Sequence, residues 1–233
     1  MGSCAVFIGV FMNIAGFQKT SFVDYPNVIA SVIFTKGCNM RCTYCHNKHI
    51  LGADAPVVAE AEVLEYLLKR KDMIKGVVIT GGEPTLQGDL LEFMQRIKAF
   101  GFKIKLDTNG LKPDVLNEVI KAGLVDYIAM DVKATLDKYS AVCGVNIDKD
   151  KIKESIEMIK QSGIDYEFRT TFCPELTKED ILEISEMIGS VNGFYLQQYR
   201  QVEGGKEPHL PSYVNDAADM IIQSGRKCVV RGL

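Results

Sequence analysis

The sequence predicts an α/β fold, a partial open (β/α)6 TIM-like barrel with a short N-terminal β extension. Short apolar runs that are typical of buried strands alternate with segments of helical spacing, which favours right-handed βαβ units and a parallel sheet. About six such units follow one another, fewer than the eight that a closed barrel needs. The length of 233 residues, with 47% hydrophobic and 24% charged residues, fits a single globular domain.

The strands and helices are expected in a regular order. Residues 14–22 and 28–35 predict two strands, and the Asp24-Tyr-Pro-Asn27 segment between them favours a turn. Further strands are expected at 76–80, 102–106, 127–132, 166–172, 194–199 and 228–231. Helical spacing of apolar residues predicts helices around 63–68, 90–97, 115–122, 152–159, 181–188 and 216–223. Thr177-Lys-Glu-Asp180 resembles a capping box before the helix at 181–188.

Residues 13–233 are expected to form one domain, and residues 1–12 an N-terminal extension with Met12 as an alternative start. The apolar residues 5–11 have no Lys or Arg before them and no small-residue cleavage site after them, which argues against a signal peptide. No stretch approaches the ~20 apolar residues of a membrane-spanning helix. A net charge of −3 gives no reason to expect nucleic-acid binding. We therefore expect a cytoplasmic protein that binds neither nucleic acid nor membrane.

Three cysteines, Cys38, Cys42 and Cys45, form a C-x3-C-x2-C run directly after an apolar stretch. A [4Fe–4S] cluster normally takes four cysteines, so three would leave one iron open to another ligand. The alternative is a closed zinc site with His46 or His49 as fourth ligand, although no second ligand pair follows. The remaining cysteines are scattered and are expected to be buried as small hydrophobic residues: Cys4, Cys143, Cys173 and Cys228.

Polar motifs follow three successive predicted strands, at the carboxyl ends where parallel α/β folds collect functional groups. They are Thr80-Gly-Gly-Glu-Pro84, Asp107-Thr-Asn-Gly110 and Asp131-Val-Lys133. Two consecutive glycines let the backbone approach a ligand closely. Taken alone, each motif also has a plain structural interpretation: a tight turn, an Asx turn before a helix, and a surface salt bridge.

The C-x3-C-x2-C run, with an aromatic residue before its third cysteine, resembles the cluster loop of radical S-adenosylmethionine (SAM) enzymes. Its Tyr44-Cys-His-Asn47 ending is similar to the glycyl-radical-enzyme activating branch, which includes the pyruvate formate-lyase activating enzymes. The stretch from Gly16 to Pro26 resembles one subgroup, the anaerobic ribonucleoside-triphosphate reductase activating proteins. The resemblance spans roughly residues 13–200.

This resemblance implies one [4Fe–4S] cluster held by the three cysteines, with SAM at the open iron. It implies that Gly81, Gly82 and Glu83 hold the methionyl amine of SAM. Asp107 is expected near the SAM amino acid, and a monovalent cation beside it is a further candidate cofactor. Lys133, next to Asp131, is expected to meet the SAM carboxylate or ribose.

The remaining cofactor contacts are expected from the cluster loop and from later strands. The expected residues are Tyr44, His46, Asn109 and Gln198. In the sixth barrel strand the pyruvate formate-lyase type carries a histidine near the ribose, and here Gln198 or Tyr199 is expected to replace it. Arg169 is expected to join the polar lining of the site. No catalytic side chain beyond the cluster ligands is expected.

By this resemblance, SAM is reductively cleaved, and the 5′-deoxyadenosyl radical takes a hydrogen atom from a glycine of a partner glycyl radical enzyme. The expected partner is an anaerobic ribonucleotide reductase, with a flavodoxin- or ferredoxin-type electron donor. Two alternatives stay open. A radical SAM enzyme for a small molecule would have a closed pocket with polar anchors near Arg169 and Arg200. A non-catalytic iron–sulfur or zinc binding module would have a filled four-ligand site.

Overall fold

The computed structural model describes residues 12–191 and 193–233, so nearly all of the predicted extension at residues 1–12 lies outside the described residues. Its sheet has eight strands in the order β1 to β8. β1 (Ile14–Ser21) is antiparallel to β2 (Ala30–Thr35). The strands that follow in parallel are β3 (Gly76–Gly81), β4 (Lys103–Thr108), β5 (Tyr127–Asp131), β6 (Asp165–Phe172), β7 (Phe194–Gln198) and β8 (Val229–Arg231).

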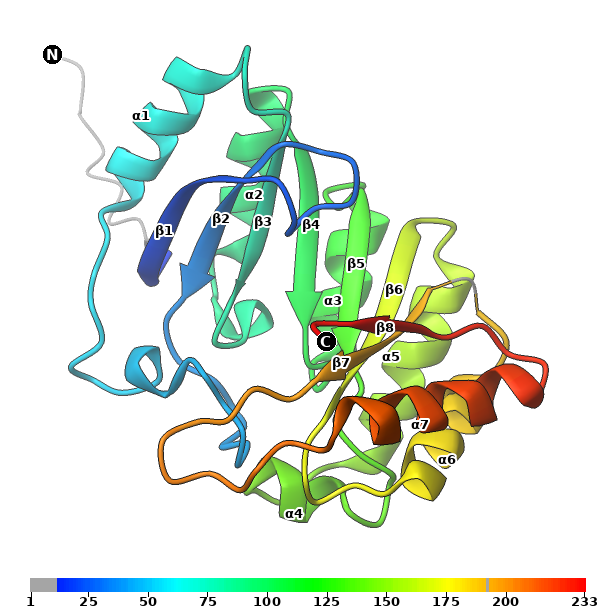
Figure 1. Ribbon diagram of the computed structural model, residues 1–233. Helices are drawn as coiled ribbons and strands as arrows, with labels where there is room; N and C mark the ends of the chain where they lie inside the picture. The colour runs from blue at the N-terminus through cyan, green and yellow to red at the C-terminus, as the bar shows by residue number, and fades with distance from the viewer. Residues whose placement is uncertain (1–11, 192) are drawn as a thin grey trace, which may run out of the picture.

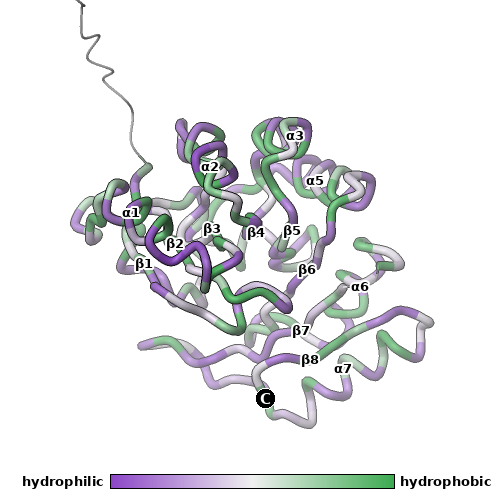
Figure 2. Tube along the Cα trace, turned by 90° about the horizontal axis from the view of Figure 1, so that it is seen from above, coloured by the Kyte–Doolittle hydropathy of each residue, from purple (hydrophilic) through white to green (hydrophobic). Residues whose placement is uncertain are grey.

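The strand series curves from β1 round to β8 without closing (Figure 2). The predicted partial open barrel with an N-terminal β strand is therefore confirmed. β1 and its turn are built locally: Ser21 Oγ donates to Asp24 at 2.5 Å, and Asn27 takes a positive φ of 60°. Such backbone is tolerated by asparagine better than by most residues.

Helices cover the convex face of the sheet and join successive parallel strands (Figures 1 and 2). They are α1 (Glu60–Arg70), α2 (Leu90–Ala99), α3 (Pro113–Lys121), α5 (Lys149–Gln161), α6 (Lys178–Ile188) and α7 (Pro211–Gln223). Each presents an apolar stripe to the sheet; in α2, Phe93 and Ile97 are fully buried. Among the described residues, no helix combines the length and the apolar character that crossing a membrane requires.

Most of the helices begin two to five residues before the predicted apolar positions, and in two of them, α3 and α7, a proline marks the start. Pro113 opens α3 and Pro211 opens α7, each within the first turn, where the missing N–H costs nothing. At the start of α6 the predicted capping box is confirmed. Thr177 accepts from the backbone N–H of Asp180, and Asp180 accepts from that of Thr177 at 2.6 Å.

Three short elements at the carboxyl end of the sheet were not predicted. They are the 3-10 helices η1 (Lys48–Ile50) and η2 (Pro84–Leu86) and the five-residue helix α4 (Tyr139–Cys143). Segments of three to five residues are too short to show a helical period in the sequence. All three lie beside the segments that carry the polar motifs.

The concave face of the sheet carries buried charged side chains on β4 and β6, opposite the apolar convex face. On β4, Ile104 and Leu106 are fully buried in the apolar core, whereas the alternate residues Lys105 and Asp107 form an ion pair at 2.5 Å. On β6, Glu167 is 2% exposed and pairs with Arg231 of β8 at 3.0 Å. Buried charges require partners, so ionic pairing organises the inside of the barrel.

Helix α1 offers a direct test of which apolar side chains belong to the core. Leu67 is fully buried, whereas its neighbour Leu68 is 49% exposed. We expect Leu67→Ala to lower the free energy of unfolding by about 2–5 kcal/mol because it leaves a cavity. Leu68→Ala should change it by no more than about 0.5 kcal/mol. Urea denaturation followed by circular dichroism measures both values, and equal losses would contradict this packing.

Candidate functional site

The loop that follows β2 carries the three cysteines and is fixed at its base by backbone and side-chain hydrogen bonds. Lys36 N–H donates to Asn13 O at 2.7 Å, and Gln87 Nε2 donates to Lys36 O at 2.9 Å. Glu83 N–H donates to Gly37 O at 2.9 Å. Before its first cysteine, the loop is thereby tied to the residue that precedes β1 and to the two residues that flank η2.

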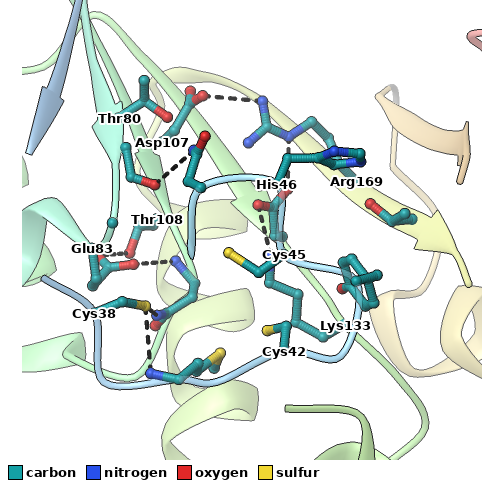
Figure 3. A pocket seen from close by; sticks show the side chains of 18 of the residues that line it. Cys38, Cys42, Cys45, His46, Thr80, Glu83, Asp107, Thr108, Lys133 and Arg169 are labelled. Carbon is teal, nitrogen blue, oxygen red and sulfur yellow. Dashed lines mark hydrogen bonds and ion pairs between the residues drawn. The ribbon is translucent and has the colours of Figure 1, made fainter. Parts of the chain in front are cut away.

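Cys38, Cys42 and Cys45 are half-buried and line one cavity of about 330 Å³ at the carboxyl ends of the strands (Figure 3). The backbone N–H of Met40 donates to Cys38 Sγ at 3.4 Å, and Asn109 Nδ2 lies 3.8 Å from the same sulfur. These donors favour the thiolate form of Cys38, the form that binds metal.

The thiols of the loop differ in acidity because their surroundings differ. Burial raises the pKa of the Cys38 thiol to about 11 and raises that of Cys45. A hydrogen bond from Cys143 lowers the pKa of Cys42 to about 6, against the effect of burial. The ammonium of Lys133 favours the charged form of all three thiols. One buried cation, Lys133, therefore stabilises the thiolate form of all three cysteines.

The Gly81-Gly82 turn after β3 lies against the cysteine loop. A Cβ atom built on Gly82 would stand 1.8 Å from Gly37 O, a distance that no side chain permits. Gly81 has a φ of 108°, in the region that favours glycine. Asn47 Nδ2 also donates to Gly81 O at 3.1 Å. Both glycines are thus needed for the two segments to meet at the cavity.

Glu83 joins the turn after β3 to the turn after β4 (Figure 3). Its carboxylate accepts from Thr85 N at 3.1 Å and from Thr85 Oγ1 at 2.6 Å. It also accepts from Thr108 Oγ1 at 2.8 Å and from Asn109 N at 2.7 Å. Burial raises the pKa of this carboxyl group, while the four donors lower it. The sequence suggested that the Glu83 carboxylate accepts from the amine of SAM. In the structure this carboxylate accepts mainly from protein donors.

Arg169 connects the carboxyl ends of three strands. Its Nε donates to Asp131 Oδ1 at 2.8 Å, and its guanidinium lies 3.2 Å from Asp107 Oδ2. Lys133 Nζ holds the other oxygen of Asp131 at 2.9 Å. Burial would raise the pKa of Asp131, but Arg169 and Lys133 outweigh it and hold that pKa well below its usual range. Arg169 thus belongs to the polar lining, as expected.

Asp107 is paired in the same way. Burial would raise the pKa of its carboxyl group, and Arg169 and Lys105 lower it below its usual value. Lys105 holds one oxygen at 2.5 Å and Arg169 the other. The monovalent cation expected beside Asp107 stays a prediction.

The structure brings nearly all of the predicted site residues together. The same cavity is lined by Cys38, Cys42, Tyr44, Cys45, His46, Gly81, Gly82, Glu83, Asp107, Asn109, Asp131 and Lys133. Gln198 lies outside this lining, and its Nε2 donates to His209 O at 2.9 Å. Its neighbour Gln197 lines the cavity instead. The sheet register pairs Gln197 with Thr171, which also lines the cavity, so Gln198 faces the other way.

Sequence reasoning missed several lining residues, and strand alternation was the signal for two of them. Thr171 follows Arg169 by two positions on β6, and Gln197 is its register partner on β7. Asn47 and Thr108 carried no such signal, because their role depends on contacts between distant loops. Among the described residues, the buried hydroxyl of Tyr44 has no hydrogen-bond partner, which leaves an unused donor in the loop.

Comparison with known proteins agrees with this geometry. Residues 32–188 match the model of the family described as "Radical SAM superfamily". The chain belongs to the radical SAM superfamily. It is 36% identical over 195 residues to the "Putative glycyl-radical enzyme activating enzyme MJ1227" of Methanocaldococcus jannaschii, covering 80% of this chain and 79% of that protein. The chain therefore falls in the activating branch of the radical SAM superfamily.

More distant relatives of this radical SAM chain include an activating enzyme and a cyclase. It is 28% identical to a pyruvate formate-lyase-activating enzyme of Clostridium pasteurianum, covering 78% of each chain. It is also 28% identical to a probable GTP 3′,8-cyclase of Pyrococcus horikoshii, but there it covers 69% of this chain and only 52% of the cyclase. A solved domain of a pyruvate-formate lyase-activating enzyme from Bacteroides vulgatus shares the fold, with a TM-score of 0.57 and 18% identity. The alignment covers 68% of this chain and 99% of that domain.

The site fits the [4Fe–4S] cluster and SAM that radical SAM membership implies. Within the part of the chain that the structure describes, no group of three or more His, Cys, Asp or Glu side chains is arranged around a single metal ion. The three thiols nevertheless line one cavity, which suits a group with several irons. When bound, a reduced cluster supplies the electron that cleaves SAM. Cys38, Cys42 and Cys45 would hold the cluster, and the Gly81-Gly82 backbone and Lys133 would be available to SAM in the same cavity.

The Gly82 contact gives a test of how the radical SAM site is assembled. Gly82→Ala should push the turn after β3 away from Gly37 and weaken SAM binding by at least about tenfold, since a bound group must be held in a fixed position. Gly88→Ala is the matched control, because a Cβ there meets nothing within 4 Å. Equilibrium dialysis of labelled SAM against the reconstituted protein measures both. Equal affinities for the two variants would show that this contact does not shape the site.

Proposed function

We propose that this chain activates a glycyl radical enzyme by creating the radical on a glycine of that partner. The observation that carries the proposal is the 36% identity over four fifths of the chain to the Methanocaldococcus jannaschii protein, joined to a cavity that contains the full cysteine set and the polar motifs. The activity is inferred from the name of this relative. The residues that would carry it out are inferred from the lining of the cavity.

In the proposed reaction, one electron enters the sulfonium of SAM and the bond between sulfur and C5′ breaks. Methionine and a 5′-deoxyadenosyl radical result. This radical takes a hydrogen atom from the Cα of the partner's glycine, which leaves 5′-deoxyadenosine and a glycyl radical. The protein's own contribution is to orient SAM through the turn after β3 and through Lys133, and to bury the reacting atoms at the inner face of the sheet.

The charges of the cavity favour this activity over chemistry on a small anionic substrate. Arg169 is already paired with Asp107 and Asp131, and Lys133 is paired with Asp131. Arg200, expected as an anchor on the alternative hypothesis, is exposed and lies outside the residues that line the cavity. A triphosphate would need cations that are not already neutralised. The similarity to GTP 3′,8-cyclases keeps small-molecule chemistry as the second candidate.

The proposed partner is an anaerobic ribonucleotide reductase, and the proposed location is the cytoplasm. Support for the partner comes from the Gly16–Pro26 stretch, which forms β1 and the turn after it. Support for a reducing compartment comes from the cysteines of the described residues, all of which are free thiols. The curved sheet is open between β1 and β8, which suits a glycine loop that enters from another protein.

The proposed function is tested by anaerobic incubation of the reconstituted protein with SAM, dithionite and the anaerobic ribonucleotide reductase of the same genome. We expect a glycyl radical in the electron paramagnetic resonance spectrum and a matching amount of 5′-deoxyadenosine by chromatography. Cys42→Ala should abolish both signals, and Cys228→Ala should leave both unchanged. Deoxyadenosine without a glycyl radical would overturn the proposed partner. Absence of both signals from a protein with full iron content would overturn radical SAM activity altogether.

We further propose that the electron comes from an acidic carrier of the flavodoxin or ferredoxin type. Exposed Arg41 and Lys48 border a surface hollow that also contains Cys42 and Cys45. No Asp or Glu occurs between residues 36 and 53, although the whole chain has a net charge of −3. Opposite charge at such a surface steers a diffusing partner to it.

Lys48→Glu tests this electron-entry surface, with Lys151→Glu on the exposed side of α5 as the control for charge alone. We expect Lys48→Glu to slow cluster reduction by reduced flavodoxin by about threefold to tenfold at low salt, and the difference should shrink at high salt. Reduction by dithionite should be equal in both variants. Stopped-flow absorbance measures the rates. An equal flavodoxin rate for the two variants at low salt would rule out this surface.

A further inference from the structure

The turn after β4 carries an asparagine whose side chain is buried beside the cysteine loop. Asn109 is only 4% exposed. Its backbone N–H donates to Glu83 Oε2 at 2.7 Å, and the hydroxyl of Thr108 donates to Glu83 Oε1 at 2.8 Å. The buried carboxylate of Glu83 therefore fixes the backbone from which the Asn109 side chain projects, independently of any bound group.

Hydrogen bonds determine which way the Asn109 amide points. Its Oδ1 accepts from the backbone N–H of Leu111 at 3.1 Å, which only the oxygen end of an amide can do. The nitrogen end therefore faces the cysteine loop, where Nδ2 donates to Asn39 Oδ1 at 2.8 Å and lies 3.8 Å from Cys38 Sγ. Because an amide nitrogen has two N–H groups, it can serve both acceptors at once. The direction of the contact with sulfur follows from the amide itself.

The sulfur of Cys38 has two N–H groups beside it. One is the Asn109 amide, and the other is the backbone N–H of Met40, which donates at 3.4 Å. The free thiol also lies 3.9 Å from Asn39 Oδ1, a contact in which the sulfur donates. A sulfur that binds iron has lost its proton, so the contact with Asn39 then loses its donor, whereas the two N–H groups stay. Of these two, the Asn109 amide is the one that a substitution can remove.

We propose that Asn109 is a positioning residue for the cluster: its amide N–H donates to the Cys38 sulfur and raises the reduction potential of the cluster that Cys38 holds. Hydrogen bonds to the sulfurs are among the factors that set the potential of iron–sulfur clusters. A donor at a ligand sulfur stabilises the reduced cluster, which carries the additional negative charge. The inference rests on the cluster that radical SAM membership implies and does not depend on the identity of the partner.

Two other roles for Asn109 lead to different results. The first is the contact with SAM that the sequence suggested; both N–H groups of the amide already face protein acceptors, which leaves SAM no donor from this side chain. A residue that only contacts SAM has no effect on the potential when SAM is left out. The second role is a mechanical anchor that holds the loop through Asn39. An anchor of this kind is lost equally when either partner of the amide–amide hydrogen bond is removed.

The test compares Asn109→Ser and Asn109→Ala with Asn39→Ala as the matched control. Serine can still accept from the backbone N–H of Leu111, as in the turns that serine forms, but it lacks the amide that reaches Cys38. Asn39→Ala breaks the same amide–amide hydrogen bond and leaves the N–H group at the sulfur. Iron and sulfide content are measured on each reconstituted protein, together with the reduced fraction of the cluster by electron paramagnetic resonance at fixed potentials, without SAM and without a partner.

We expect full cluster content in Asn109→Ser and in Asn39→Ala. In both Asn109 variants the ratio of reduced to oxidised cluster should fall about threefold to tenfold at a fixed potential, where tenfold corresponds to 59 mV for one electron. In Asn39→Ala the ratio should stay within about twofold of the unmodified protein, because the donor remains.

Three results would overturn the proposal. An unchanged ratio in Asn109→Ser would make the contact with the sulfur irrelevant to the cluster. An equal fall in Asn39→Ala would assign the effect to the anchoring of the loop. Loss of the cluster from both Asn109 variants would identify a residue that only builds the site. If the alanine variant alone lacks a cluster, the ratio in the serine variant decides between support and contradiction.

Discussion

The ion pairs of Arg169 with Asp107 and Asp131 are the interaction on which the rest of the site depends. They connect β4, β5 and β6 at the edge of the sheet where the cavity lies. Charges buried inside a barrel are tolerated only when they are paired. On this concave face and in the cavity beside it, four cations face four carboxylates; the cations are Lys105, Lys133, Arg169 and Arg231, and the carboxylates are Glu83, Asp107, Asp131 and Glu167. Among these cations, Lys133 favours the charged form of the three thiols, the form in which cysteine binds metal.

A second constraint joins this charged face to the cysteine loop. The loop touches the turn after β3 through Gly37 and Gly82, the turn after β4 through Cys38 and Asn109, and helix α4 through Arg41 and Cys143. Each contact comes from a different βα unit. The loop is therefore positioned by the whole sheet, and its geometry depends on the fold rather than on the cysteine spacing alone. Because of this, changes in α4 are expected to reach the cluster without touching SAM.

The sequence was sufficient for the architecture and for most of the site. Alternating strand and helix patterns predicted the open barrel, and motifs at strand ends predicted where Asp107, Asp131 and Lys133 would meet. It was not sufficient where a contact joins distant segments. Nothing in the spacing of Cys143 showed that α4 would dock on Cys42, and Gln197 rather than Gln198 faces the cavity because register decides the side of a strand. The hydrogen bonds of Glu83 could not be predicted for the same reason, because its partners Thr85, Thr108 and Asn109 come from two separate loops.

On the proposed function, the radical formed in this cavity takes its hydrogen atom directly from a glycine of another protein. The most direct measurement uses a partner ribonucleotide reductase labelled with glycine deuterated at Cα. After anaerobic reaction with SAM, mass spectrometry of the 5′-deoxyadenosine shows whether it carries the label. Direct transfer predicts one deuterium in the deoxyadenosine, in proportion to the glycyl radical formed. Deoxyadenosine without deuterium, formed alongside a glycyl radical, would contradict direct transfer.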